Sequence, residues 1–252
     1  MQVFPGKKVY FISDFHLGAP DYAKSLVREK NIVKFLDGIK KDAASIFIAG
    51  DLFDFWYEYK NVVPKGFVRI LGKLAELTDS GIAIHFFVGN HDMWMNDYFE
   101  KELGVKVYHQ PAEFEINEKK FFIGHGDGLG PGDKKYKFIK RVFRNKISQR
   151  LFGFLHPGSG IGMANYFSRK SRVATGQSDQ QFLGEEKEWL IVFARDLLKS
   201  RHYDYFIFGH RHLPLDFQLS PTSRYINLGD WINYNSYAEF DGENVVLKFY
   251  HS

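Results

Sequence analysis

The sequence predicts an α/β (α+β) protein in which short buried strands alternate with helices. Three observations lead to this prediction. Apolar runs of strand length recur along the 252 residues. The segments between the first three runs have the apolar spacing of amphipathic helices. Five runs each end in a cluster of Gly, Asp, Asn and His. This alternation is typical of a sheet with crossover helices, in which sites gather beyond the carboxyl ends of the strands.

The first half of the chain supplies three strands and two helices. The strands are expected at Lys8–Ser13, Ala44–Ala49 and Ile82–Val88, and the helices at Ala23–Lys40 and Phe67–Leu77. Gly81 is a suitable stop after the second helix. Each of the three strands is followed at once by a polar cluster.

The second half begins with an expected hairpin, in which residues 114–116 and 121–123 flank Asn117-Glu118-Lys119-Lys120. A helix is then predicted over Leu183–Lys199 and a buried strand over Asp204–Phe208. The tail is typical of antiparallel strands, with Asp241-Gly242 as the last hairpin turn. These strands are expected at Leu215–Leu219, Tyr225–Leu228, Ser236–Phe240 and Val245–Tyr250.

Composition limits the class of protein. An apolar content of 44% supports a sizeable core, and the absence of cysteine excludes disulfides and thiolate metal sites. We find no repeat, linker or low-complexity tract, so residues 1–252 are expected to form a single domain with a helical insertion at about 131–185. No signal-peptide core precedes the domain, and no apolar run reaches the roughly 18 residues of a spanning helix. A cytoplasmic protein is therefore expected.

Five polar clusters carry the chemistry. They are Asp14-Phe15-His16, Gly50-Asp51-Leu52-Phe53-Asp54, Gly89-Asn90-His91-Asp92, Gly124-His125-Gly126-Asp127 and Gly209-His210-Arg211-His212. A lone Asp after a strand is usually a helix cap, and a lone His is usually structural. That explanation does not account for five clusters that all follow strands. In the last cluster, His210 and His212 are expected on the same side because strand side chains alternate.

The side chains of the clusters suit divalent metal ions. Asp14, His16, Asp51, Asn90, His125, His210 and His212 offer oxygen and imidazole nitrogen, which bind Mn²⁺, Fe²⁺, Zn²⁺ or Mg²⁺. Seven ligands exceed the need of one ion but serve two ions that share Asp51. Two ions roughly 3.5–4 Å apart can hold a hydroxide and clamp a phosphoryl group. Because no Ser or Cys nucleophile stands out, direct attack by metal-activated water is the simplest mechanism.

His91 and Asp92 extend the third cluster beyond Asn90. Asp92 is expected to orient the imidazole of His91, as carboxylates near metal sites do. His91 would then contact a phosphoryl oxygen or protonate the leaving group, so Asn90, His91 and Asp92 are the predicted catalytic residues. Asp54 and Asp127 are candidates to support ligand histidines, although helix capping explains either of them equally well.

The five blocks, in this order, resemble the calcineurin-like metallophosphoesterase superfamily. They reach from Asp14 to His212, most of the chain. The resemblance implies a β-sandwich flanked by helices, and it places His91 close to the scissile phosphate. It also implies one metal bound by Asp14, His16, Asp51 and His212, and a second bound by Asp51, Asn90, His125 and His210.

The expected insertion is strongly basic. Eleven of the 34 Lys and Arg residues lie between Lys134 and Arg172, a span without Asp or Glu, on an otherwise acidic body. Residues 134–155 interleave these charges with apolar residues at roughly helical spacing. A basic amphipathic helix of this kind can lie on an anionic membrane or line an acyl-chain pocket. It can also simply pack on the body with a solvated basic face.

Within the superfamily, the chain is similar to the UDP-2,3-diacylglucosamine hydrolases of lipid A synthesis, which carry a helical lid after the Gly-His-Gly-Asp block. The lid features matched here are Asp133 with Tyr136, and the cluster Ser168, Arg169, Lys170 and Arg172; Arg141 and Arg144 lie on its basic turns. The resemblance implies these as substrate-binding residues. It also implies Mn²⁺ as the expected metal, release of UMP, and a place on the cytoplasmic membrane face. The best-studied branch has Arg where this chain has His91.

Three alternatives stay open. The first is a metallophosphoesterase that hydrolyses a soluble nucleotide. The second is a nuclease that uses the basic segment on a phosphate backbone, which the aliphatic content of the insertion disfavours. The third is a metal-bound membrane scaffold, disfavoured because all seven ligands are present. A further expectation is that Gly158-Ser159-Gly160-Ile161-Gly162 forms a flexible bend between two lid helices.

Overall fold

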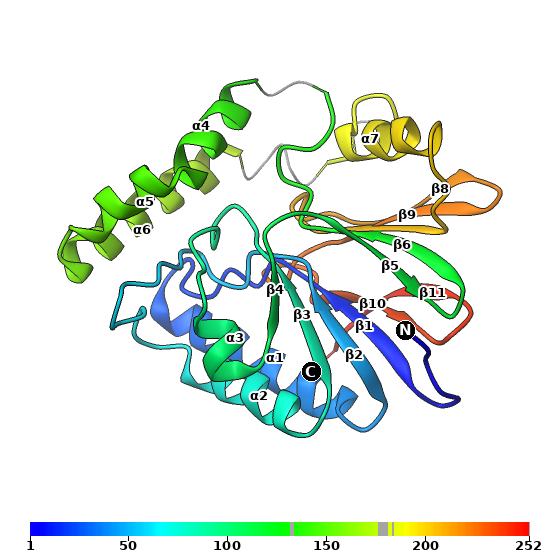
Figure 1. Cartoon of the computed structure of the whole chain (residues 1–252), viewed down its shortest axis with the longest axis horizontal. Helices are drawn as coiled ribbons and strands as arrows, with labels where there is room; N and C mark the ends of the chain where they lie inside the picture. The colour runs from blue at the N-terminus through cyan, green and yellow to red at the C-terminus, as the bar shows by residue number, and fades with distance from the viewer. Residues whose placement is uncertain (132–133, 176–180, 183, 252) are drawn as a thin grey trace.

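Two β-sheets pack face to face in the protein (Figure 1). The computed structural model describes residues 1–131, 134–175, 181–182 and 184–251, and for residues 134–135 and 169–175 it describes the backbone alone. The first sheet has the order β11 (Val245–Phe249), β10 (Ser236–Phe240), β1 (Lys8–Ile12), β2 (Ala43–Ile48), β3 (Ala83–Phe87) and β4 (Lys106–Tyr108). The second has the order β5 (Ala112–Ile116), β6 (Lys119–Ile123), β7 (Tyr205–Phe208), β9 (Ser223–Leu228) and β8 (Pro214–Ser220).

Each sheet is built around parallel strands. Strands β1, β2, β3 and β4 are parallel neighbours, and β10 and β11 add antiparallel strands beside β1. In the second sheet β6, β7 and β9 are parallel, while β5 and β8 pair antiparallel at the two edges. The loops that follow these parallel strands gather at one edge of the sandwich, below the helical insertion (Figure 1). That edge therefore collects the polar clusters.

Aromatic side chains fill the space between the sheets. Phe11 stacks on Phe47 and on Phe121, with ring centroids 5.3 and 5.8 Å apart, which joins the two sheets directly. The outer face of the first sheet is covered by α1 (Tyr22–Ile39), α2 (Val68–Asp79) and α3 (Tyr98–Leu103) (Figure 1). The helix α7 (Trp189–Leu198) packs on the outer face of the second sheet. The core thus forms three layers of apolar contact, and the predicted α/β sandwich is confirmed.

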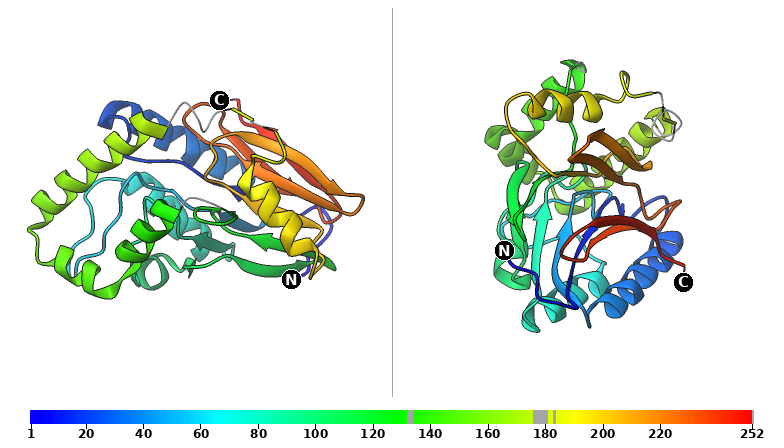
Figure 2. Two further views of the ribbon diagram at one scale, coloured as in Figure 1. Left: turned by 90° about the horizontal axis from the view of Figure 1, so that it is seen from above. Right: turned by 90° about the vertical axis from the view of Figure 1, so that its right-hand side faces the viewer.

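The insertion projects as a helical arm from the sandwich (Figure 2). It consists of α4 (Lys134–Arg144), α5 (Lys146–Gly153) and α6 (Pro157–Thr175). Two body side chains fasten it: Trp94 Nε1 donates to the carbonyl oxygen of Phe143 at 2.7 Å, and the Tyr57 hydroxyl donates to that of Gln149 at 2.7 Å. None of the helices in the described part of the chain is both long and apolar enough to cross a membrane.

The expected bend at Gly158–Gly162 is wrong, because these residues lie inside α6. The break comes earlier, between α5 and Pro157. Proline suits the first turn of a helix, and His156 Nδ1 accepts the backbone N–H of Gly158 at 3.2 Å. Gly160 instead serves close packing, since a Cβ there would lie 2.6 Å from the Tyr59 hydroxyl.

Other boundaries differ from the sequence predictions by small amounts. The helix predicted over Leu183–Lys199 begins at Trp189, after a turn in which Gly184 has a φ of 95°. Leu183 lies outside the described residues. The sequence analysis did not predict α3 or β4, which are short and rich in charged residues. None of these differences moves a polar cluster away from its strand.

Candidate metal centre

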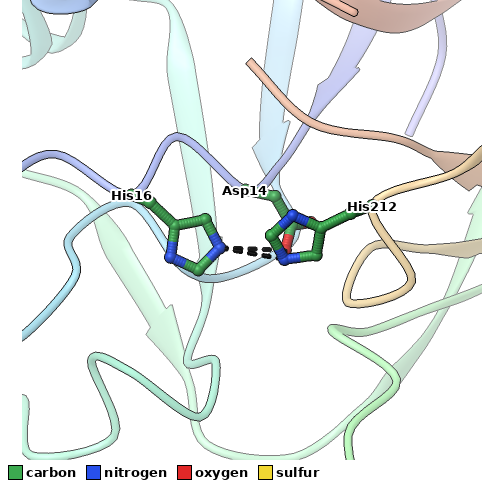
Figure 3. Close-up of side chains that lie close together, drawn as sticks. All are labelled: Asp14, His16 and His212. Atoms are coloured by element: carbon green, nitrogen blue, oxygen red, sulfur yellow. Dashed lines mark hydrogen bonds and ion pairs between the residues drawn. The ribbon is translucent and has the colours of Figure 1, made fainter. Parts of the chain in front are cut away.

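The five clusters meet at the edge of the sandwich. Asp14 and His16 follow β1, Asp51 follows β2, and Asn90 follows β3. His125 follows β6, and both His210 and His212 follow β7. Figure 3 shows how Asp14, His16 and His212 approach one another although they come from different sheets. The fold therefore brings together side chains that lie almost 200 positions apart.

One group of ligands lies around His16. Its Nε2 atom is 3.1 Å from Nε2 of His212, and the Oδ1 atom of Asp14 lies 3.6 Å from His16 Nε2 and 3.4 Å from His212 Nε2 (Figure 3). Two imidazole nitrogens that face each other at this distance need a proton or a cation between them. The three side chains fit a shared metal ion.

The second group lies around His125. Its Nε2 atom is 3.2 Å from Oδ2 of Asp51 and 3.0 Å from Oδ1 of Asn90. The ring of His210 lies 5.1 Å from that of His125 between centroids. The same Oδ2 atom of Asp51 is 3.7 Å from His16 Nε2, so Asp51 contacts both groups. This is the position that a carboxylate shared by two ions requires.

Unusual backbone geometry aims these side chains. Asp14, His16, Asp51, His210 and His212 all have φ values between 45° and 69°. Left-handed backbone is uncommon outside glycine, although Asp, Asn and His adopt it most readily. The expected reason for the pairing of His210 and His212 is thus wrong. Strand β7 ends at Phe208, and a left-handed turn, not strand alternation, directs both rings toward the site.

The buried carboxylates of the site favour the binding of cations. Burial works against the ionised forms of Asp14 and Asp51, yet the neighbouring histidines lower the pKa of both carboxyls. Burial likewise opposes charge on His16 and His125, but the surrounding carboxylates raise the pKa of each to about 10. Among the described residues, Oδ1 of Asp14 is buried without a hydrogen-bond partner. Divalent ions fit this donor set, because they satisfy the carboxylates and the imidazole nitrogens together.

Hydrogen bonds from the outer side of the rings fix the ligand histidines. His125 Nδ1 lies 2.8 Å from the carbonyl oxygen of Ala49, and His212 Nδ1 lies 3.1 Å from Oδ2 of Asp230. Carboxylate and carbonyl partners of this kind set the tautomer of a metal-binding imidazole. The sequence analysis missed Asp230, although it follows β9 in the same Gly-Asp pattern as Asp51.

His91 sits beside the first group. Its ring is nearly perpendicular to that of His16, with centroids 4.9 Å apart. The Nδ1 atom lies 3.0 Å from the carbonyl oxygen of Asp54 and 3.1 Å from the hydroxyl oxygen of Ser168 in α6. Since a carbonyl can only accept, Nδ1 carries a hydrogen. His91 is thus held by the body and touched by the insertion.

The role expected for Asp92 needs correction. Its Oδ1 accepts the backbone N–H of Gly89 and its Oδ2 that of Leu52, both at 2.8 Å. This buried carboxylate ties the loop after β3 to the loop after β2, and the backbone of Asp54 orients His91 instead. Burial, helped by the charge of Asp51, raises the pKa of Asp92 to about 7.

The two carboxylates expected to support histidines differ from each other. Asp54 Oδ1 lies 3.7 Å from Nδ1 of His16, close to the expected role. Asp127 instead accepts from the Tyr136 hydroxyl at 2.8 Å and from Lys140 Nζ at 2.6 Å. Asp127 therefore fastens α4 to the metal loop, a role that sequence spacing did not reveal.

The predicted substrate residues spread over the insertion. Tyr136 and Ser168 reach the metal centre through Asp127 and His91. Arg144 lines a cavity beside His125, while Arg141 is exposed. Asp133 and the side chains of Arg169, Lys170 and Arg172 lie outside the described residues.

A buried ion pair supports the loop of His210 and His212, and the sequence analysis missed it. Arg211 Nε donates to Oε1 of Glu188 at 2.5 Å, and both side chains are at most 3% exposed. The guanidinium also lies over the Trp189 ring, 4.8 Å from its centroid. Glu188 immediately precedes α7, so the pair joins this helix to the metal loop.

Comparisons with known proteins identify the family of the chain. The family model described as calcineurin-like phosphoesterase matches residues 7–214. The UDP-2,3-diacylglucosamine hydrolase of Porphyromonas gingivalis is 42% identical over 96% of this chain and 97% of that protein. The Haemophilus influenzae protein of the same name is 29% identical, over 96% of this chain and 99% of its own. Among solved structures, an Escherichia coli phosphoesterase, YfcE, gives a TM-score of 0.43 at 15% identity, covering 92% of this chain and 87% of its own.

Proposed function

Because the chain belongs to the calcineurin-like phosphoesterase family and is therefore a metal-dependent hydrolase, we propose a specific reaction for its metal centre. The protein hydrolyses the pyrophosphate of UDP-2,3-diacylglucosamine to UMP and 2,3-diacylglucosamine 1-phosphate. The observation that carries the proposal is the similarity to the P. gingivalis hydrolase over nearly the whole of both chains, lid included.

In the proposed mechanism, Asp14, His16, Asp51 and His212 would hold one ion, and Asp51, Asn90, His125 and His210 would hold the other. Two divalent ions, Mn²⁺ in our proposal, would neutralise charge on the phosphoryl oxygens and lower the pKa of water. His91 keeps its Nδ1 hydrogen on the Asp54 carbonyl. Burial lowers the pKa of His91, so the negative charge of a bound phosphoryl group would be what favours a second proton on Nε2; that N–H would donate to a phosphoryl or leaving oxygen.

The insertion fits the lipid part of this substrate. Between residues 134 and 168 of the insertion, eleven large apolar side chains are between 40% and 86% exposed, beside a high density of Lys and Arg. They are Phe138, Ile139, Val142, Phe143, Ile147, Leu151, Phe154, Leu155, Met163, Tyr166 and Phe167. Many exposed apolar side chains on one insertion are typical of a membrane or ligand contact. In our proposal the arm, an insertion at about 131–185 in a single domain, rests on the anionic inner face of the cytoplasmic membrane.

The test is UMP release by Mn²⁺-loaded protein from UDP-2,3-diacylglucosamine and from the same UDP-sugar without acyl chains. We expect turnover of the acylated substrate alone, with Asp51→Ala as the inactive control. Equal turnover of both substrates would remove the lipid assignment and leave a soluble nucleotide as substrate. No turnover of either would contradict the proposed reaction.

A further inference from the structure

A cavity of about 220 Å³ opens beside the second group of ligands. Its walls come from α4, from the end of β3, from the connection between β4 and β5, and from the loop after β6. His125 and Asp127 line the cavity on the side of the metal ligands, and Lys137, Lys140 and Arg144 of α4 line it as well. A ligand that reaches from the metal ions into this space would pass His125.

The free charge in this cavity is that of Arg144. Lys140 Nζ is bound to Asp127, and Lys137 Nζ donates to the carbonyl oxygen of Gly130 at 2.5 Å. Among the described residues, the half-buried Arg144 guanidinium has no ion pair or hydrogen bond. A half-buried guanidinium with unused donors is a binding group for an oxygen-rich ligand.

The remaining walls are aromatic and uncharged. Phe87 and Tyr108 stack on each other at 4.9 Å, and both line the cavity with His109. Burial and the nearby charge of Arg144 lower the pKa of His109, so its imidazole is neutral near pH 7. Planar rings beside donor groups are the usual environment of a bound nucleobase.

The volume of the cavity indicates which half of the substrate it can hold. At about 220 Å³ the cavity lies below the roughly 300–1,000 Å³ of pockets for drug-sized ligands, so it suits a small group such as the base of a nucleoside and is too small for two acyl chains. The exposed apolar side chains of the insertion lie outside the cavity wall. The acyl chains and the nucleoside therefore have different surfaces available on the two sides of the metal centre.

We propose that this cavity binds the nucleoside of the substrate, with the Arg144 guanidinium donating to the O4 carbonyl oxygen of the base. The proposal rests on the proposed function and specifies how that site selects its nucleotide. A guanidinium only donates, so it pairs with an acceptor such as O4 of uracil. Cytosine has an amino donor in place of O4, so UMP binds more tightly than CMP.

Calorimetric titration of the Mn²⁺-loaded protein with UMP, CMP and inorganic phosphate tests this. Hydrogen bonds to charged groups contribute enough that Arg144→Gln should weaken UMP binding by about tenfold or more. Phosphate binding should not change, because phosphate contacts the metal centre alone. Arg150→Gln, an exposed arginine on α5 outside the cavity wall, is the matched control and should leave all three affinities unchanged.

Two results would overturn the assignment. Unchanged UMP affinity in Arg144→Gln would show that the cavity does not take the nucleoside. An equal loss for UMP and phosphate would make Arg144 a phosphate contact instead. Turnover of UDP-2,3-diacylglucosamine, measured separately on the wild type, judges the proposed function, so failure of one proposal is distinguishable from failure of the other.

Discussion

At the scale of single residues, the glycines of the clusters are as specific as the ligands. A Cβ at Gly89 would collide with the Asp51 carboxylate, one at Gly50 with the His125 ring, and one at Gly209 with Oδ2 of Asp14. Each glycine thus lies against a proposed ligand from another strand. Glycine therefore precedes Asp, Asn or His in these pairs because the loops pack too closely for a Cβ atom.

Gly209→Ala should therefore damage the metal centre without unfolding the protein. The added methyl group must displace Asp14, and we expect Mn²⁺ affinity to fall at least tenfold, as for other lost ligand support. Gly72→Ala is the control, because a Cβ there meets nothing within 4 Å in the middle of α2. It should raise the free energy of unfolding by about 0.5–1 kcal/mol. Unchanged metal affinity in Gly209→Ala would contradict the packing argument.

Asp230→Asn tests the support of one ligand histidine. The amide still accepts from the backbone of Asn233 but no longer offers a charged acceptor to His212 Nδ1. We expect the affinity of the protein for one of the two metal ions to fall about 10–100-fold. A calorimetric Mn²⁺ titration would then show two separate binding steps. Asp216→Asn, whose carboxylate pairs with Arg224 on the surface of β8, should titrate like the wild type. Loss of neither ion, or an equal loss of both, would speak against this role.

Most proposed ligands could be predicted from the sequence, because each follows the end of a strand that the local sequence pattern already indicates. The partners of these ligands could not. Asp92 and Asp127 occur in the same motifs, yet one binds backbone amides and the other binds α4. The difference depends on which loop passes nearby, and spacing along one chain does not contain that information.

At the scale of elements, α7 is coupled to the metal loop through Glu188 and Arg211. Glu188→Gln should destabilise the protein by about 3–5 kcal/mol, because it removes the carboxylate from a buried ion pair with Arg211. Glu185→Gln breaks only the exposed pair with Arg195 and should cost less than about 1 kcal/mol. Denaturant unfolding of both variants measures the difference. Similar stability of the two variants would contradict this role of the buried pair.

Helix boundaries show where local sequence signals are sufficient. The N-terminus of α1 has Asp21 as its cap, with its side chain accepting from the Lys24 amide, and the prediction misses it by one residue. The insertion is different, because its apolar residues are mostly exposed. The spacing of these residues therefore does not indicate a buried helix face. The break before Pro157 was therefore missed, although the proline itself marks it.

At the scale of the whole molecule, the sequence alone indicated strands, helices and a common edge for the clusters. It did not indicate that β6, β7 and β9 would form a separate sheet, and the sandwich came from the family resemblance. Hairpin β5–β6 follows β4 directly, yet it pairs with strands some 80 residues later. Such long-range pairing depends on burial in the assembled core, through contacts such as Phe11 with Phe121.

The arm and the body together predict membrane binding that depends on charge and on apolar contact. Phe154, at 86% exposed the most open large apolar residue, lies where α5 meets α6. Burying a phenylalanine is worth about 1.5–3 kcal/mol, so Phe154→Ser should weaken binding to anionic vesicles by about tenfold or more. Phe4→Ser is the matched control, since Phe4 is 72% exposed but far from the arm in sequence.

Sedimentation with anionic and neutral vesicles at two salt concentrations measures the effect. Because the arm carries many Lys and Arg residues, we expect it to bind anionic vesicles, with an affinity that falls as the salt concentration rises. Equal losses in both variants, or salt-independent binding to neutral vesicles, would place the contact elsewhere.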